Sequence, residues 1–374
     1  MTEPLYRKIH TELREKIVKG EYPPGAKLPS EKELCQQYDT SRITSRRVME
    51  MLADEGLIVR QPGRGSFVAD PLPEDGQSSS SQVNDKKLIG FVITDFSASF
   101  GTELISGAER TTTSHGAFLV LRRSFGVPEK EEKAIEELLQ LGVDGLLILP
   151  AQAEHFSTKI LQLVIDRFPL VLVDRDLKGI AATSVRTDNV AGALCGVRYL
   201  LEHGHRHIGL ASPPPMESTT IEDRINGFVQ AHAEAGVAFD QEHWLQVTST
   251  LPGSFYDDNI ESDVESIKAH FEKHPELTAV FAIEYNIALL VAEAAKRLGL
   301  RIPEDLSIVC FDSPDVGIED HRFTHLLQDQ EGMGRFAVES LLAMIRGDDA
   351  PKKVLLDAKL VEGLSTKSPS MVHS

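Results

Sequence analysis

Apolar residues recur at helical spacing through the first 56 positions of the chain and predict three helices. The first lies within residues 4–20 and has a single apolar face. The second begins at Ser30, which forms a capping-box pattern with Glu33 three positions later. The third begins after Ser41 and ends at Gly56, because glycine commonly terminates helices. Two short helices this close together indicate a helix-turn-helix.

The segment after these helices predicts a small β-hairpin. Residues 57–61 and 66–68 have the composition of two short strands, and a glycine-rich turn with Arg64 at its tip joins them. Three helices followed by such a hairpin, over residues 1–70, predict a winged helix-turn-helix domain of the α+β class.

Arginines and hydroxyl groups gather on the first turns of the third helix. They belong to Arg42, Thr44, Arg46 and Arg47. A helix that enters the major groove of DNA presents its N-terminal residues to base edges and phosphates, and arginine can bind guanine through two hydrogen bonds. The pattern therefore predicts a DNA-binding head. A winged helix that contacts protein, with solvated arginines, is the alternative.

Beyond residue 86 the pattern changes to apolar runs separated by helical segments of ten or more residues. The runs occupy 88–93, 117–121, 145–149, 169–173, 207–211, 278–283 and 306–311. Such runs are typical of parallel strands that are buried on both faces and belong to βαβ units. We expect two open sheets, and therefore an α/β body of two lobes.

The polar and aromatic residues that follow these runs are candidates for a ligand site. In chain order they are Asp95, Phe96, Arg175, Glu284, Tyr285 and Asp312. Ligands of open parallel sheets bind beyond the carboxyl ends of the strands. Carboxylates and arginines hydrogen-bond hydroxyl groups, and aromatic side chains stack on rings, so the set predicts a cleft for a small polyol.

The chain has 374 residues and a net charge of −18 that is unevenly distributed. Residues 1–70 carry 12 Lys and Arg against 11 Asp and Glu, so the remainder carries −19. Because phosphate repels an acidic body, DNA contact should be confined to the head. Residues 71–86 are rich in Pro, Ser, Gly, Asp and Asn and predict a flexible linker between two domains.

No motif in the sequence predicts a metal, a cofactor or catalysis. His203, His205 and His207 fall across a turn into a strand, so we expect no metal there. GxSxG and Walker patterns are missing from the sequence. The sequence has neither a secretory signal nor a long apolar run, which predicts a cytoplasmic protein. The three cysteines, which suit a reducing compartment, are Cys35, Cys195 and Cys310.

Four segments of the head carry a family resemblance. They are PLYRKIHTELREKI (4–17), PPGAKLPSEKEL (23–34), TSRITSRRVMEMLADEGLI (40–58) and PGRGSFV (62–68). Together they resemble the winged helix-turn-helix of GntR-family regulators. The DNA contacts implied by this resemblance are Glu31, Arg42, Thr44, Arg46, Arg64 and Gly65. Ser45 departs from the family, where an apolar residue is common, and this change concerns packing rather than a DNA contact.

The body resembles the effector domain of LacI-family repressors, which is related to periplasmic sugar-binding proteins. The segments that carry this resemblance are 143–150, 169–176, 184–193, 199–210, 224–228, 278–282, 298–312 and 360–366. The resemblance covers residues 87–366 and leaves a tail of 367–374. The effector contacts it implies are Asp95, Phe96, Arg175, Arg224, Asp312 and Gln328.

Several positions of the body leave the effector site open to other interpretations. Arg224 and Asp312 are also compatible with a structural ion pair. Glu284 and Tyr285 stand where the family often has Asn-Asp, so the ligand is open. Gly363 stands where the family often has arginine, in a late strand with little bearing on function.

A GntR-type head on a LacI-type body is similar to the arabinose-operon repressors. The resemblance implies a bacterial regulator that represses carbohydrate-utilisation genes and leaves its operator when a sugar or sugar derivative binds. The expected partners are double-stranded operator DNA, a small polar effector and a second copy of the chain, without a membrane. The alternatives are a sugar-responsive activator, a sugar sensor whose head contacts protein, and a carbohydrate enzyme with an attached DNA module.

Overall fold

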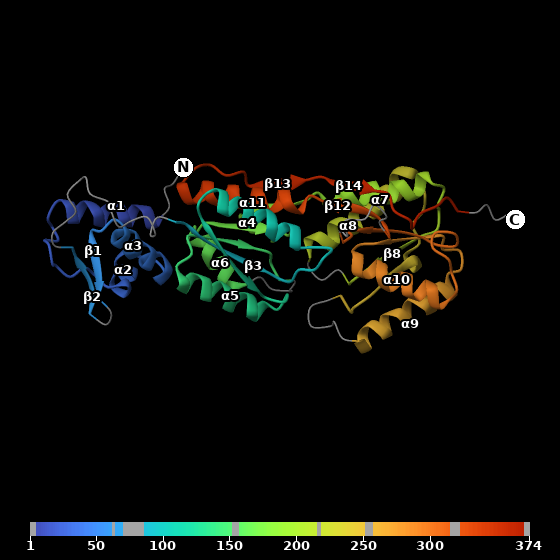
Figure 1. The fold of residues 1–374 in the computed structure, drawn as a ribbon, viewed down its shortest axis with the longest axis horizontal. Coiled ribbons are helices and arrows are strands. Elements are labelled where there is room, and N and C mark those ends of the chain that lie inside the picture. Colours follow the sequence, from blue (N-terminus) through green and yellow to red (C-terminus); the bar gives the residue numbers. More distant parts are fainter. Residues whose placement is uncertain are drawn as a thin grey trace.

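A computed structural model describes residues 5–61, 64–69, 86–151, 157–214, 218–250, 257–314 and 322–369. The described parts form an elongated molecule in which a small head and two α/β lobes follow one another along the long axis (Figure 1). The N-lobe lies beside the head, and the C-lobe lies at the opposite end. The predicted linker, 71–86, lies outside the described residues except for its last position, and only 367–369 of the tail are described.

The head has the predicted three helices and hairpin. The elements are α1 Leu5–Val18, α2 Glu31–Tyr38, α3 Arg42–Asp54, β1 Ile58–Gln61 and β2 Gly65–Val68. Ser30 caps α2 as expected, because its hydroxyl accepts the backbone N–H of Glu33 while the Glu33 carboxylate accepts the N–H of Ser30. Pro62 and Gly63, in the predicted turn of the wing, lie outside the described residues.

The N-lobe contains a six-stranded parallel sheet in the order β13-β7-β6-β5-β3-β4. Its strands are β3 Leu88–Ile93, β4 Phe118–Arg123, β5 Gly145–Ile148, β6 Leu170–Val173, β7 Thr183–Thr187 and β13 Lys353–Leu356. Helices α4 Thr102–Ser114 and α11 Gln330–Arg346 cover one face, and α5 Pro128–Leu141 and α6 Thr158–Ile165 cover the other. The sheet is buried between them, as its apolar runs predict.

The C-lobe contains a second six-stranded sheet, in the order β14-β12-β11-β10-β8-β9, with only β14 antiparallel. Its strands are β8 Ile208–Ser212, β9 Trp244–Gln246, β10 Ala279–Ala282, β11 Ser307–Phe311, β12 Thr324–Gln328 and β14 Ala358–Val361. Its helices are α7 Asn189–Glu202, α8 Thr219–Ala235, the short 3-10 helix η1 Gln241–His243, α9 Asp257–Lys273 and α10 Tyr285–Arg297.

The two lobes are joined by three crossings of the chain. These connect β7 to α7, β12 to α11 and β13 to β14. The carboxyl ends of the parallel strands of both sheets face the space between the lobes, so the crossings place the strand-end residues of the two lobes opposite one another. Among the described residues, no helix is long and apolar enough to cross a membrane.

Candidate functional site

A cleft of about 600 Å³ lies between the lobes. The eight effector residues expected from the sequence all line it. They are Asp95, Phe96, Arg175, Arg224, Glu284, Tyr285, Asp312 and Gln328. Strand ends and helix starts supply most of this lining, which follows from the parallel order of both sheets.

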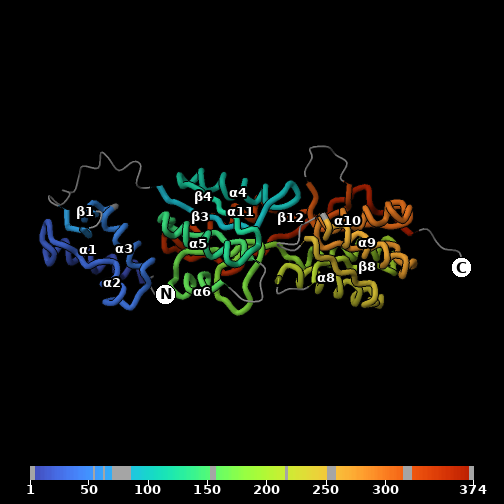
Figure 2. Tube along the Cα trace, turned by 90° about the horizontal axis from the view of Figure 1, so that it is seen from below, coloured from blue at the N-terminus to red at the C-terminus, as the bar shows by residue number. Residues whose placement is uncertain are grey.

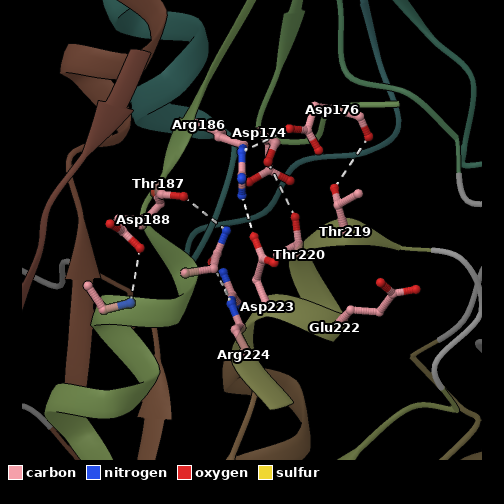
Figure 3. A network of polar contacts seen from close by, with 12 residues as sticks. Asp174, Asp176, Arg186, Thr187, Asp188, Thr219, Thr220, Glu222, Asp223 and Arg224 are labelled. Carbon is pink, nitrogen blue, oxygen red and sulfur yellow. Dashed lines mark hydrogen bonds and ion pairs between the residues drawn. The ribbon is translucent and has the colours of Figure 1, made fainter. Parts of the chain in front are cut away.

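Arg224 is fixed at the floor of the cleft by partners other than a carboxylate. Its Nε donates to Asn189 Oδ1 at 2.8 Å and its Nη1 to the backbone oxygen of Ile283 at 2.6 Å. The guanidinium carbon lies 3.7 Å from the centroid of the Phe311 ring. Asn189 in turn donates to the carbonyl of Thr187, so the arginine links helix α8 to the end of strand β7 (Figure 3).

Asp312, which directly follows Phe311, has its own hydrogen-bond partners. Gln328 donates its Nε2 to Asp312 Oδ2 at 2.7 Å and accepts the hydroxyl of Thr187 at 2.6 Å. Burial raises the pKa of Asp312 to about 7, although the charge of Arg224 acts in the other direction. The structural ion pair considered from the sequence is therefore not the arrangement seen, because each of the two side chains is held by different groups.

Buried polar atoms without a hydrogen-bond partner among the described residues occur at the cleft, and they include Asp174 Oδ1, Arg175 Nε and Ser218 Oγ. Arg175 donates its Nη1 to the carbonyl of Pro150 at 3.0 Å, and its Nε lies 3.5 Å from Asp174 Oδ2. Leaving a buried polar atom unsatisfied costs roughly 1–3 kcal/mol. A ligand rich in hydroxyl groups would supply the missing hydrogen bonds.

Glu284 and Tyr285, the departures from the family pattern, lie where the cleft meets the start of helix α10. Burial raises the pKa of Glu284, and the charge of Arg224 opposes this change. The Tyr285 ring packs edge-on against Phe323, with 5.8 Å between ring centroids. Glu284 therefore adds a carboxyl group to those of Asp95, Asp174 and Asp312, at a position where the family often has an amide.

The rim of the N-lobe is aromatic and more exposed. Arg123 donates to Asp95 at 2.5 Å, and its guanidinium lies 5.1 Å from the ring centroid of Phe96 and 4.4 Å from that of Phe125. Phe96 is 38% exposed and Phe125 46% exposed. Arg123 therefore links two partly exposed rings that line the cleft.

Several residues of this site were not identified from the sequence. Gln330 donates to the Ser99 carbonyl, accepts the Gly101 N–H and lies 3.4 Å from Asp312 Oδ1, so it ties the first loop of the N-lobe to the cleft. Nothing in the sequence marks this residue, because its partners are far away in the chain. Ser218, Arg123 and Phe125 were also missed, and the last two follow the β4 run and were within reach of the strand-end rule. Asp174 was noted as a strand-end residue next to Arg175, with a loop cap as its expected role, and it lines the cleft.

A network of charged residues joins the lobes behind the cleft (Figure 3). Arg186 of β7 pairs with Asp223 of α8, and its Nε lies 3.3 Å from Asp176 Oδ2. Thr220 of α8 donates to the backbone oxygen of Asp174. These contacts connect the end of the N-lobe sheet to the first turns of a C-lobe helix.

In the head, the residues predicted to contact DNA differ in exposure and in the hydrogen bonds that they make. Arg42 and Arg64 are exposed. Glu31 accepts a hydrogen bond from Arg60 at 2.5 Å. Thr44 is buried, and its hydroxyl lies 3.1 Å from that of Ser41. Gly65 has φ +117°, and a Cβ there would lie 2.9 Å from the side chain of Lys27, so this wing position requires glycine.

Helix α3 lies on the side of the head that is next to the N-lobe (Figure 2), and its residues Arg46 and Arg47 contact the body. Arg46 donates to the backbone oxygen of Gln140 at 2.8 Å, and Arg47 donates to that of Asp144 at 2.7 Å. A groove of about 1340 Å³ between head and N-lobe surrounds these contacts. Its lining is the contact surface of the two units, so we assign the effector to the smaller cleft.

Ser45 is fully buried between the two helices of the motif. Its polar side chain suggested looser packing at this position, but the structure does not show it. Its hydroxyl donates to the Ser41 carbonyl at 3.1 Å and lies 3.1 Å from the sulfur of Cys35. The hydroxyl is therefore satisfied, and an apolar residue is not required at this position.

The three histidines at 203, 205 and 207 take separate partners. His203 Nδ1 lies 2.8 Å from the carbonyl of Tyr199, and both ring nitrogens of His205 are hydrogen-bonded, to Thr278 and to the Lys367 carbonyl. The His207 ring instead packs edge-on against that of His243, with 6.0 Å between ring centroids.

Both parts of the chain match models of known families. Residues 5–68 match the model described as bacterial regulatory proteins, gntR family. Residues 197–366 match the model of the periplasmic binding protein-like domain.

Two curated relatives match almost end to end. The arabinose metabolism transcriptional repressor of Geobacillus stearothermophilus is 28% identical over 98% of both chains. That of Halalkalibacterium halodurans is 25% identical over 97% of both chains. A LacI family regulator from Enterococcus faecium, solved with bound ribose, has a TM-score of 0.63 at 23% identity and covers 76% of this chain and 100% of its own. This last likeness concerns the fold.

Proposed function

Since the chain joins a DNA-binding domain of the gntR family to a periplasmic-binding-protein-like effector domain of the LacI type, we propose that it is a sugar-responsive transcriptional repressor and not an enzyme. The observation that carries the proposal is the inter-lobe cleft. All eight expected effector residues line it, together with buried polar atoms that lack partners. A polyol satisfies such atoms without any chemical reaction.

The effector contacts divide by chemistry. Arg175 and Arg224 donate to hydroxyl oxygens, while Asp312 and Glu284 accept from hydroxyl groups, and Phe96 and Tyr285 pack against the ring. Asp95 supports the rim through Arg123, and Gln328 positions Asp312. The additional carboxyl group of Glu284 favours a ligand with additional hydrogen-bond donors.

On the DNA side, two heads of a homodimer read the half-sites of an operator in the cytoplasm, with helix α3 in the major groove. Arg42, Thr44, Arg46 and Arg47 contact bases or phosphates. Glu31 at the start of α2, with Arg64 and Gly65 in the wing, adds contacts on either side. Ligand binding changes the relative position of the lobes and releases the operator. A coupling free energy of about 1–3 kcal/mol corresponds to a change in operator affinity of roughly 5- to 150-fold.

A thermal-shift and calorimetric screen against sugars and sugar phosphates tests the effector side. We expect at least one ligand to raise the unfolding temperature without being converted into product. Arg224→Ala and Asp312→Ala should each abolish this shift. Asp349→Ala, at an exposed position outside the cleft, should retain it. A ligand shift that persists in both cleft variants contradicts the assignment, and turnover of the sugar would favour the enzyme alternative.

Operator binding by the same protein preparations tests the DNA-binding part of the proposal. Arg42→Ala together with Arg46→Ala should remove binding to promoter DNA and leave ligand affinity unchanged. A protein that ignores every duplex at low salt, with or without ligand, would favour a sensor whose head contacts protein. Tighter DNA binding in the presence of ligand would favour an activator or co-repressed regulator.

A further inference from the structure

A cluster of histidine and glutamate side chains lies at the end of the C-lobe opposite the cleft. His243 ends η1 just before strand β9, and His274 and Glu276 lie in the turn between α9 and β10. Strands β9 and β10 flank β8 in the sheet, so their amino ends bring these segments together. The cluster is therefore separated from the effector cleft by the length of the sheet.

We propose that His243, His274 and Glu276 form a binding site for one divalent transition-metal ion of the Zn²⁺ class. One ligand atom from each of the three lies within 4.8 Å of the other two. Glu276 Oε1 is 2.9 Å from His243 Nε2 and 3.2 Å from His274 Nδ1. Tetrahedral ligands of a zinc ion are separated by about 3.3 Å, since the metal-ligand bonds are about 2.0–2.1 Å. Small side-chain rotations suffice to enclose an ion.

Buried ring nitrogens provide a second observation. His274 Nε2 and His270 Nε2 are buried and have no hydrogen-bond partner among the described residues. The His270 and His274 rings pack with 4.7 Å between centroids, and those of His243 and His274 with 5.3 Å. Three imidazoles so close together are unfavourable when protonated. An ion that replaces the protons shared with Glu276 holds the same groups together.

The donor set selects the class of ion. Two imidazole nitrogens and one carboxylate oxygen favour Zn²⁺, Co²⁺ or Ni²⁺ over Mg²⁺ and Ca²⁺, which prefer oxygen ligands. Three protein ligands leave a further coordination position for water. A bound ion links the edge strand β9 to the α9–β10 turn, so it stabilises the C-lobe independently of the effector.

The only tryptophan of the chain, Trp244, follows His243 directly and reports on the site. Untagged full-length protein, treated with chelator and dialysed, is titrated with Ni²⁺ while Trp244 fluorescence is followed, and with Zn²⁺ by calorimetry. We expect quenching and heat that saturate at one ion per chain, together with a higher unfolding temperature. Mg²⁺ at the same concentration should produce neither signal.

Three variants decide the assignment. Glu276→Gln keeps the shape of a half-exposed side chain and should weaken binding at least about tenfold, as should His274→Ala. His115→Ala, an exposed histidine of the N-lobe, is the matched control and should bind like the unchanged chain. The proposal is overturned if no stoichiometric binding occurs, if Glu276→Gln binds as tightly as the unchanged chain, or if His115→Ala weakens binding equally.

Discussion

At the scale of single residues, the cleft combines fixed donors with carboxyl groups whose protonation depends on burial. Arg224 has no freedom to rotate, because two hydrogen bonds and an aromatic ring hold it. Asp312 is held by Gln328 in the left-handed region, at φ +62°. A ligand therefore meets preformed geometry on both sides, which lowers the entropy lost on binding.

The pKa of Asp312 predicts how stability depends on pH. This carboxyl ionises near pH 4 in the unfolded chain and near pH 7 in the folded protein, where burial raises its pKa to about 7. Between these values the folded state binds more protons, so stability falls as pH rises, by at most about 1.4 kcal/mol per pH unit for this group. Asp312→Asn should reduce that slope and raise the unfolding temperature more at pH 8 than at pH 5.

Differential scanning fluorimetry from pH 5 to pH 8 provides the measurement, with the exposed Asp349→Asn as control. Glu131, whose pKa burial also raises to about 7, should leave a residual slope in the Asp312→Asn variant. An unchanged slope after Asp312→Asn would show that Asp312 is ionised in the folded protein at low pH.

At the scale of helices and strands, all seven apolar runs correspond to strands. Six of them are buried on both faces, which is the pattern that a sequence reveals, whereas β4 is a partly exposed edge strand. The strands that the apolar pattern did not predict differ from these in composition and exposure. β7 contains Arg186, which pairs across the lobes, and β13 and β14 are edge strands with exposed positions. Their pairing depends on segments far away in the chain, which periodicity does not record.

The candidate site was predictable to the extent that strand ends converge. Asp95, Arg175 and Asp312 follow apolar runs directly, whereas Gln330 was invisible because its partners come from the first loop of the N-lobe. The contacts of Arg46 and Arg47 with the body likewise depend on how two folded units meet. Local pattern carries no information about such contacts.

The crossing of α4 and α11 depends on two glycines. A Cβ on Gly334 would lie 2.2 Å from the Leu104 carbonyl oxygen, and one on Gly107 would lie 2.2 Å from that of Glu331. Because the obstructing atoms belong to the backbone, a side chain at either position would force the two helices apart. Gly334→Ala should destabilise the body by about 1–3 kcal/mol or more, measured by denaturant unfolding.

Gly209→Ala is the matched control for this variant. A Cβ on Gly209 meets its nearest atom at 3.4 Å, which is an ordinary contact. Equal stability of Gly334→Ala and Gly209→Ala would mean that the helices separate without cost.

At the scale of the whole molecule, the head is held against the N-lobe by groups that the proposed function requires elsewhere. Arg46 and Arg47 bind backbone oxygens of the body, and Ile43 packs against the apolar cluster of the N-lobe. DNA and the N-lobe should therefore compete for the same side of helix α3.

Arg7 allows this competition to be tested without touching the expected DNA contacts. It lies on α1 and donates to the Ile345 carbonyl of the body at 2.7 Å. Arg7→Ala removes a positive charge, which alone would weaken DNA binding. By loosening the head it should instead tighten operator binding by the full-length chain about three- to tenfold, since such a hydrogen bond contributes about 1 kcal/mol.

Electrophoretic mobility shift or fluorescence anisotropy at fixed salt gives the comparison. Lys8→Ala, on the same helix with an exposed side chain, loses the same charge and should bind equally or more weakly than the unchanged chain. If Arg7→Ala behaves like Lys8→Ala, the head contacts do not limit DNA binding.

The three crossings between the lobes also determine what motion is available to the body. The three connections are a few residues long and run side by side, so they resist sliding and twisting of one lobe against the other. Opening and closing of the cleft is therefore a rotation of the lobes about one hinge axis through the connections. In the described part of the chain, the body residues that contact the head belong to the N-lobe. In a pair of subunits joined through their bodies, a swing of a few degrees at these connections becomes a shift in the distance between the two reading helices, and DNA of fixed helical pitch responds to that distance.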